Sequence, residues 1–404
     1  MNKRYVVIGG GQAGASAVAR LRERDDAAQI DLVCREPVLP YQRPPLSKTF
    51  LSGEMPLERL LLHPQGWYDD NRITVHLGNA CDALQTGEQK AILQDGTKLS
   101  FDAALLTVGS KARELPSHVT QGAAGFYTLR TTQDADALGK ELSEGRKALI
   151  VGGGYIGLEA AAICRKSGMD VTVVEQAGRI LQRVAAPQTS DYYRALHQSH
   201  GVRLLEQVGV QEFEISDGRV VGANLSTGAH LDVDVVLVGI GVSPHVELAE
   251  TADLAVENGI VVDSCCKTSA EGVFAAGDCA QFPHDGGEVR LESVPHAIHH
   301  AETAATNMTG EVEHYRAAPW FWSDQYDVKL QIAGLNTGYD RVITRAGKRE
   351  GAQSVWYFKG GQLLAVDAMN DAPAFMTARR IIENGKTIPI AVAEDATANL
   401  KDWV

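Results

Sequence analysis

The sequence predicts an α/β protein that contains two copies of one nucleotide-binding unit and a separate α+β domain towards its C-terminal end. Three observations support this fold class. A short apolar strand, a Gly-x-Gly-x-x-Gly motif and a helix follow one another at residues 4–24 and again at 147–167. The motifs begin at Gly9 and Gly152, 152 − 9 = 143 residues apart, which is too long for a solenoid repeat. From Pro319 onward, the chain is rich in aromatic residues and short alternating segments.

Length and composition fit this architecture. The 404 residues allow two to four domains at roughly 100–200 residues each. The formal net charge is 38 − 51 = −13, which argues against nucleic acid as the main partner. We find no signal peptide or bilayer-length apolar run, and the six cysteines follow no zinc or iron–sulfur spacing. We therefore expect a cytoplasmic protein with buried thiols, no metal site and no membrane partner.

Each glycine motif has the flanking elements that dinucleotide binding requires, as in Rossmann-like folds. In such a motif the first glycine makes a tight turn, the second lets the backbone approach a pyrophosphate, and the third lets helix and strand pack closely. The free N–H groups at the start of the helix then hold the anion. The expected strand, helix and strand are 5–8, 15–24 and 29–34 in the first copy, and 148–151, 158–167 and 170–174 in the second. The glycines concerned are Gly9, Gly11 and Gly14, and Gly152, Gly154 and Gly157.

Further elements complete the prediction. The C-terminal aromatic residues are most simply the core of a small sheet followed by a helix. The additional strands are predicted at 103–108, 233–240, 259–262 and 273–276, and the C-terminal helix at 374–383.

Two nucleotide folds in one chain suggest two cofactors, a tightly held flavin and an exchanging nicotinamide. Glu175 lies 18 residues after Gly157, at the end of a predicted strand. A carboxylate there accepts hydrogen bonds from a ribose diol and repels a 2′-phosphate. NADH is therefore favoured over NADPH, although Arg179 and Arg183 nearby leave NADPH open.

In the first fold, two residues that follow the second predicted strand are candidates for a contact with the adenosine. Glu36 is the candidate ribose carboxylate, and the adjacent Arg35 is an alternative contact to the adenosine. The residues alone do not decide between them.

Several longer segments are much more specific than the glycine motifs. Together they make the chain resemble, over nearly its whole length, the FAD-dependent NADH:ferredoxin reductases of bacterial oxygenase systems, of the putidaredoxin and biphenyl-dioxygenase type. The segments are 39–48 (LPYQRPPLSK), 128–131, 238–244, 273–278, 291–295 and 319–325.

The resemblance implies a glutathione-reductase-like arrangement of FAD and NAD domains. It implies a discontinuous FAD-binding domain at 1–110 and 238–315, an NADH-binding domain at 111–237 and a C-terminal α+β domain at 316–404.

The resemblance also implies roles for single residues. For FAD these are Gly9, Gly11 and Gly14 at the pyrophosphate, Arg43 and Lys48 against the flavin and its phosphates, Arg130, Asp278 at the ribityl hydroxyls, and Val294 and Trp320 at the isoalloxazine ring. For NADH they are Glu159 at the nicotinamide carboxamide and Gly241 along the nicotinamide path.

By the same resemblance, NADH passes a hydride to the flavin, and Lys48 holds positive charge near the reduced ring. Electrons then leave singly to a [2Fe-2S] ferredoxin that serves a monooxygenase or a ring-hydroxylating dioxygenase. Such ferredoxins are usually acidic, so docking on this acidic chain needs a local basic patch. The candidates by position are Lys329, Arg345, Arg379 and Arg380.

Other readings compete with this one. A flavin disulfide reductase needs a cysteine pair, and residues 41–48 contain no cysteine. A reductase for rubredoxin, or a redox-sensing flavoprotein like the apoptosis-inducing ones, stays open. Among the departures from the family pattern are Arg35, where an acid is common, and a histidine-rich helix start at His296, His299 and His300, which we expect to face solvent.

Overall fold

The structure is a computed structural model that describes residues 2–404 as two compact units. The first unit contains the chain up to Arg43 together with Pro56–Lys111 and Ser243–Pro319. The second contains Pro44–Met55, Ala112–Val242 and Trp320–Val404. Both units are therefore discontinuous in sequence.

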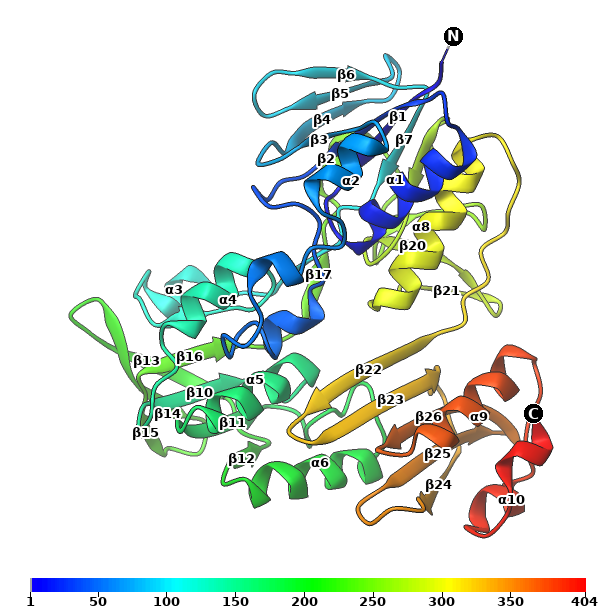
Figure 1. The fold of residues 1–404 in the computed structure, drawn as a ribbon. Helices are drawn as coiled ribbons and strands as arrows, with labels where there is room; N and C mark the ends of the chain where they lie inside the picture. Colours follow the sequence, from blue (N-terminus) through cyan, green and yellow to red (C-terminus); the bar gives the residue numbers. More distant parts are fainter. Residues whose placement is uncertain (1) are drawn as a thin grey trace. The chain divides into compact units, whose positions relative to one another are not determined.

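The first unit is built on a five-stranded parallel sheet (Figure 1). Its strand order is β19-β7-β1-β2-β3, and β1 runs beside β2 with Arg4 opposite Gln29. The central strands are buried on both faces, as expected for a parallel sheet covered on two sides. The strands are β1 (Arg4–Ile8), β2 (Gln29–Val33), β3 (Ile73–His76), β7 (Ala103–Leu106) and β19 (Val273–Ala275).

Helices α1 (Gln12–Arg24) and α8 (Val294–Met308) share one buried core with this sheet, in which small residues such as Ala17 and Ala304 allow close packing. The other face of the sheet packs on α7 (Glu247–Thr251) and β20 (Ala280–His284). The unit's remaining elements are η2 (Leu57–Arg59), α2 (Gln65–Asp70), β4 (Cys81–Gln85), β5 (Lys90–Leu93), β6 (Lys98–Ser100), β18 (Ile260–Val261) and β21 (Gly287–Val289). Strands β8 (Ser110–Ala112) and β17 (Val242–Pro244) lie where the chain passes from one unit to the other.

The second unit carries a second parallel sheet, with strand order β12-β11-β10-β16-β9. Lys147 of β10 stands opposite Asp170 of β11, which repeats the β1–β2 pairing of the first unit. The elements of this part are η1 (Pro44–Ser47), α3 (Ser117–Thr120), β9 (Phe126–Tyr127), α4 (Thr132–Gly139), β10 (Lys147–Val151), α5 (Tyr155–Lys166), β11 (Asp170–Glu175), α6 (Pro187–Ser199), β12 (Arg203–Glu206), β13 (Val210–Ser216), β14 (Arg219–Leu225), β15 (His230–Asp232) and β16 (Val235–Val238).

The same unit contains a five-stranded antiparallel sheet, ordered β22-β23-β26-β25-β24. Trp356 and Phe358 are fully buried and pack with Phe375 of α9, so these C-terminal aromatic residues form a core, whereas Trp322 and Tyr326 are only partly buried. The elements are β22 (Trp320–Gln325), β23 (Val328–Gly334), β24 (Arg341–Ala346), β25 (Gln353–Lys359), β26 (Gln362–Met369), α9 (Ala372–Glu383), α10 (Ile390–Glu394) and η3 (Leu400–Trp403).

The predicted elements are confirmed, with shifted ends. The run expected as one strand at 233–240 is shorter because Val233 bonds to Val221 of β14, and β16 begins only at Val235. Two expectations are wrong. His296 and His300 are buried against Phe282 and Tyr315, and only His299 is exposed, because α8 turns the first two inward. Burial lowers the pKa of His296 to about 4. Burial also lowers the pKa of His300 well below its ordinary value.

The second wrong expectation concerns Arg345. The residue is only 6% exposed, so it cannot belong to a docking patch. The guanidinium donates to backbone carbonyls of the C-terminal segment, among them Val392, Ala396 and Ala398. Arg345 therefore fastens this segment to β24.

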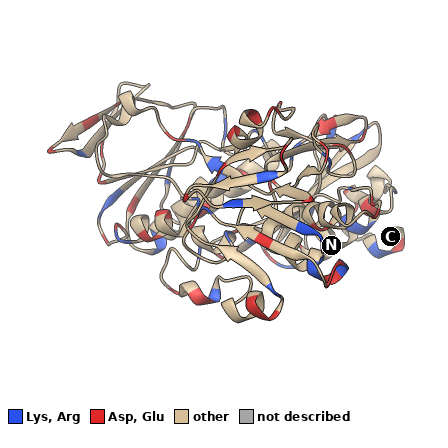
Figure 2. Cartoon of the chain, turned by 90° about the horizontal axis from the view of Figure 1, so that it is seen from above, with Lys and Arg blue, Asp and Glu red and all other residues tan. Residues whose placement is uncertain are grey.

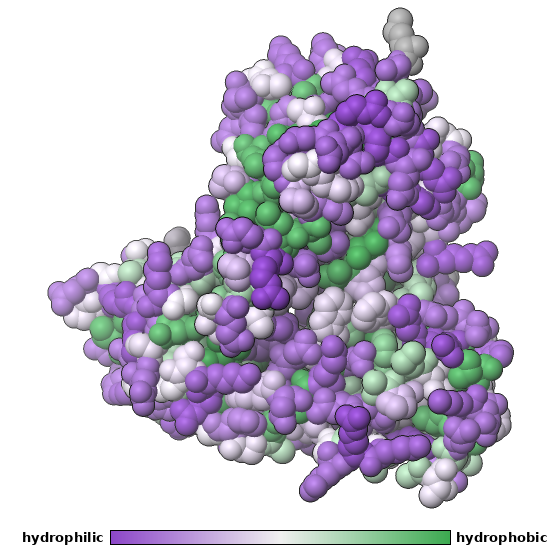
Figure 3. Space-filling model, in the orientation of Figure 1, coloured by the Kyte–Doolittle hydropathy of each residue, from purple (hydrophilic) through white to green (hydrophobic). Residues whose placement is uncertain are grey.

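Charged and polar residues are spread widely over the chain. Figure 2 shows acidic and basic residues interspersed along it, and hydrophilic residues cover most of the face shown in Figure 3. Within residues 2–404, no helix combines the length and the apolar character needed to cross a bilayer.

Candidate active site

The first glycine loop joins β1 to α1. Gly9 has a φ of +129°, and a Cβ placed there would lie 2.2 Å from the carbonyl oxygen of Thr107. A Cβ on Gly14 would lie 1.9 Å from the carbonyl oxygen of Gly9, so this glycine lets the helix cross the strand closely. Gly11 differs, because a Cβ there would meet nothing within 4 Å in the described chain. Gly11 is also the N-cap of α1, with no side-chain cap and no acid in the first turn.

The second glycine loop repeats this arrangement between β10 and α5. Gly152 has a φ of +108°, and its Cβ would lie 2.4 Å from the carbonyl oxygen of Gly239. A Cβ on Gly157 would lie 2.3 Å from the carbonyl oxygen of Gly152. Gly154 again borders open space within the described residues and caps its helix without a side-chain hydrogen bond. Both loops thus leave helix N–H groups uncapped beside room for a phosphate, which fits a dinucleotide pyrophosphate at each.

The ends of the second strands differ between the two folds. Gly152 N donates to Val174 O, and Gly9 N donates to Val33 O, so Glu175 corresponds to Cys34. The Glu175 carboxylate accepts hydrogen bonds from Gly153 N and Ala177 N, both at 2.7 Å. Glu175 therefore holds the glycine loop by hydrogen bonding. It lies at the strand end where the sequence predicts the ribose carboxylate.

Glu36 lies two residues beyond Cys34, and its carboxylate is already engaged within the first unit. It accepts from the Tyr41 hydroxyl at 2.5 Å and from the Arg43 guanidinium at 2.7 Å. Burial alone would lower the pKa of Arg43, but the neighbouring Tyr41 and Glu36 raise it overall. Arg35 next to this group is exposed. Tyr41 is a member of the site that the sequence did not indicate.

Lys48 and Glu159 lie together in the second unit. The ammonium nitrogen of Lys48 is 2.7 Å from Glu159 Oε2, and the Glu159 residue is only 5% exposed. Ser47 donates to Oε2 at 2.5 Å, and Ser323 of β22 donates to Oε1 at 2.6 Å. The two serines were missed by sequence reasoning, because serine carries no periodic signal and Ser323 is distant in sequence.

The other predicted residues are positioned by element ends. Asp278 follows Gly277 after β19 and accepts from the Ser110 hydroxyl at 3.2 Å. Val294 is the first residue of α8, which Ser293 caps.

In the second unit, Arg130 N donates to Asp134 just before α4. Gly241, with a φ of +101°, accepts from Arg113 N at 2.9 Å. Trp320 opens β22, and the guanidinium of Arg379 lies 5.1 Å from its ring centroid.

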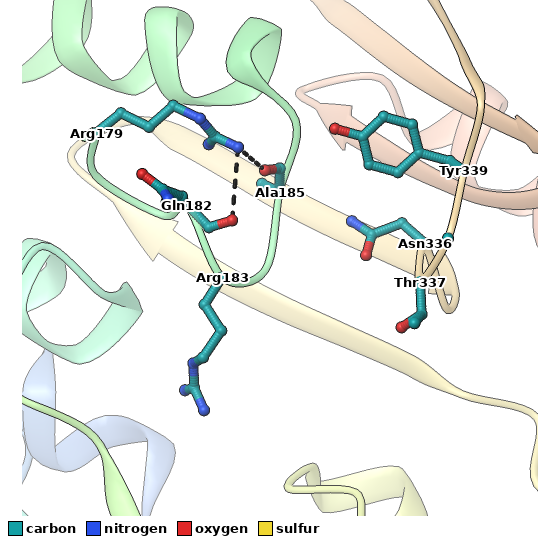
Figure 4. A pocket seen from close by; sticks show the side chains of 8 residues that line it. Arg179, Gln182, Arg183, Ala185, Asn336, Thr337 and Tyr339 are labelled. Carbon is teal, nitrogen blue, oxygen red and sulfur yellow. Dashed lines mark hydrogen bonds between the residues drawn. The ribbon is translucent and has the colours of Figure 1, made fainter. Parts of the chain in front are cut away.

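Two arginines near the second glycine loop bear on the choice between NADH and NADPH. Arg179 donates to Ser190 Oγ. Figure 4 shows that its guanidinium also donates to the carbonyls of Gln182 and Ala185, so it is used within the fold. Arg183 is exposed and extends away from Arg179 in Figure 4. Both line a small surface pocket of about 220 Å³ together with Asn336.

Two dinucleotide-binding folds and a lysine–glutamate pair whose carboxylate is buried define a nucleotide-dependent oxidoreductase. The chain belongs to the pyridine nucleotide-disulphide oxidoreductase family, whose pattern matches residues 3–301, and residues 320–404 match a reductase C-terminal family.

Individual relatives span nearly the whole chain. Rhodocoxin reductase of Rhodococcus erythropolis is 40% identical over 98% of this chain and 93% of the relative. The crystal structure of a covalent putidaredoxin reductase–putidaredoxin complex matches with a TM-score of 0.95 at 37% identity, covering 100% of this chain and 98% of that one. A rubredoxin-NAD(+) reductase of Ectopseudomonas oleovorans is 33% identical over 90% of this chain and 95% of the relative.

Proposed function

We propose that this chain is an NADH-dependent flavoprotein reductase for a [2Fe-2S] ferredoxin that serves a monooxygenase or a ring-hydroxylating dioxygenase. The observation that carries the proposal is the Lys48–Glu159 pair, in the same unit as an open glycine cradle. The similarity to rhodocoxin reductase, to putidaredoxin reductase and to the ferredoxin--NAD(+) reductase component of an anthranilate 1,2-dioxygenase system supports it. FAD held by the first glycine loop would supply the chemistry that takes a hydride from NADH and passes electrons on one at a time.

On the FAD side, Gly9, Gly11 and Gly14 bind the pyrophosphate through the uncapped start of α1. Glu36 remains the candidate for the adenosine ribose, and through its ion pair it also orients Arg43 towards the cofactor. The other FAD contacts that we propose are Lys48, Arg130, Asp278, Val294 and Trp320.

On the NADH side, the loop of Gly152, Gly154 and Gly157 binds the second pyrophosphate, and Glu175 accepts from the ribose diol. Glu159 accepts a hydrogen bond from the carboxamide N–H of the nicotinamide, and Gly241 lines its path. Lys48 holds a positive charge that stabilises the reduced, anionic flavin. We propose NADH over NADPH, because Arg179 is already committed to Ser190 and Ala185.

We propose the domain division 1–110 with 238–315 for FAD, 111–237 for NADH and 316–404 for the C-terminal domain. We also propose a cytoplasmic location, which is supported by six free cysteines. For ferredoxin docking, Lys329 and Arg380 remain exposed candidates. The guanidinium of Arg379 forms an ion pair with Glu383 at 2.6 Å and lies over the ring of Trp320.

The proposal is tested with purified holoprotein. It should be yellow, reduce ferricyanide with NADH, and reduce cytochrome c much faster when a [2Fe-2S] ferredoxin is added. Lowering the salt concentration should raise the ferredoxin-dependent rate if opposite charges steer docking. Failure of NADH to bleach the flavin would overturn the proposal.

A rubredoxin reductase is the second candidate, favoured by the 33% identical relative. The same assay separates the two when rubredoxin and ferredoxin are compared at equal concentrations. A redox-sensing role would instead show slow flavin reduction and a long-lived charge-transfer band with either carrier.

A further inference from the structure

A chain of buried hydrogen bonds leads away from Glu159 through the second unit. Ser323 Oγ is 2.6 Å from Glu159 Oε1, and Gln325 Nε2 is 3.2 Å from Ser323 Oγ. His197 Nε2 of α6 is 2.8 Å from Gln325 Oε1. Tyr326 Oη is 3.5 Å from His197 Nδ1 at the far end. Ser323, Gln325 and His197 are each fully buried.

The direction of these hydrogen bonds follows from the carboxylate. An ionised carboxylate only accepts, so the single hydroxyl hydrogen of Ser323 points to Glu159. Ser323 must then accept from the amide nitrogen of Gln325, whose oxygen in turn accepts from His197 Nε2–H. Burial is the main cause that lowers the pKa of His197 to about 4, so the ring is neutral near pH 7 and carries its proton on Nε2. Every donor in the chain therefore points towards Glu159.

The two oxygens of Glu159 are supported unequally. Oε2 is held by Lys48 at 2.7 Å and by Ser47 at 2.5 Å. The only hydrogen bond to Oε1 among the described residues comes from Ser323. Loss of Ser323 would leave the buried Oε1 without a donor. The carboxylate could then rotate towards Lys48.

We infer that Ser323, Gln325 and His197 are positioning residues that hold the Glu159 carboxylate in the one orientation in which it can accept the carboxamide N–H of the nicotinamide. The inference rests on the role proposed above for Glu159. These residues act through Glu159 and do not contact the nucleotide. Their effect is therefore on recognition of the carboxamide and not on general binding of the dinucleotide.

The test uses the FAD-loaded protein and two oxidised nucleotides, NAD+ and 3-acetylpyridine adenine dinucleotide, in which a methyl ketone replaces the carboxamide. Calorimetric titration gives both dissociation constants, and their ratio measures recognition of the carboxamide. Ser323→Ala should reduce the preference for NAD+ by about tenfold, in line with one hydrogen bond to a charged group. Ser323→Thr, which keeps the hydroxyl, should restore it.

Ser354→Ala is the matched control. Ser354 is fully buried in β25 and accepts from the Trp356 indole at 3.0 Å, away from Glu159. It should keep the wild-type ratio. If Ser323→Ala fails to fold, Gln325→Met carries the test, because it removes the donor to Ser323 at similar volume and should lower the ratio in the same direction.

The outcomes separate the inference from the proposal beneath it. If the wild-type protein binds both nucleotides equally, the carboxamide role of Glu159 is wrong and the inference falls with it. If wild type discriminates and Glu159→Gln does not, but Ser323→Ala and Gln325→Met keep the wild-type ratio like Ser354→Ala, the positioning role alone is overturned.

Discussion

Replacing Gly154 by alanine should weaken NADH binding without weakening the fold. The backbone of Gly154 has a φ of −81° and a ψ of 178°, which alanine adopts freely. The added Cβ meets no atom of the described chain within 4 Å, so no clash opposes the change. Restricting the unfolded chain should even stabilise the protein by about 0.4–1 kcal/mol.

The same methyl group should hinder binding of the nucleotide. It would project into the space through which a phosphate approaches the N–H groups of α5. Losing one charge-assisted hydrogen bond costs about 1.5–3 kcal/mol. The expected rise in the KM for NADH is therefore about 10- to 150-fold.

The assay is NADH-dependent ferricyanide reduction, with the flavin content and melting temperature of each variant measured alongside. Gly157→Ala is the contrasting variant, because its Cβ would lie 2.3 Å from Gly152 O and should destabilise the fold by about 1–3 kcal/mol. Gly11→Ala should reduce FAD retention instead. A wild-type KM in Gly154→Ala, or a loss of stability equal to that of Gly157→Ala, would refute the open-cradle reasoning.

Glu175→Ala should raise the KM for NADH far more than it lowers turnover, since it removes the acceptor for both Gly153 N and the ribose; an unchanged KM would remove Glu175 from that role. Because the pKa of His296 is lowered to about 4 in the folded protein, the unfolded state binds more protons than the folded state below about pH 6.5. His296 should therefore lower the free energy of unfolding by about 2 kcal/mol when the pH falls from 7 to 5. His296→Asn should abolish that part of the loss in urea titrations at the two pH values; Asp367, whose raised pKa of about 6 acts in the opposite direction, is common to both proteins. Arg345→Met should lower the unfolding free energy by about 2 kcal/mol or more and leave the KM for ferredoxin unchanged, whereas Arg380→Ala should raise that KM.

The sequence predicts the nucleotide folds well because local rules decide them. A strand, a glycine turn and a helix are adjacent in the chain, and each glycine is required by a backbone contact such as that between Gly14 and the Gly9 carbonyl. The strand that ends at Glu175 could be placed for the same reason, since apolar residues buried on both faces of a parallel sheet form a continuous run.

Residues that depend on tertiary packing could not be predicted in this way. His296 and His300 look polar in sequence, yet the face of α8 that meets Phe282 and Tyr315 buries them. Arg345 looks like a surface cation, yet it satisfies backbone carbonyls of a segment about 50 residues later. Ser323 approaches Glu159 only because β22 lies beside α5.

The central claim is that NADH reduces a bound flavin, which then delivers single electrons to a ferredoxin. Anaerobic rapid mixing of the holoprotein with one equivalent of NADH, followed by oxidised [2Fe-2S] ferredoxin, tests it most directly. We predict immediate bleaching of the flavin absorbance by NADH, followed by its recovery as about two ferredoxins are reduced per NADH. A flavin that stays oxidised with NADH, or that stays reduced when ferredoxin is added, would contradict the account.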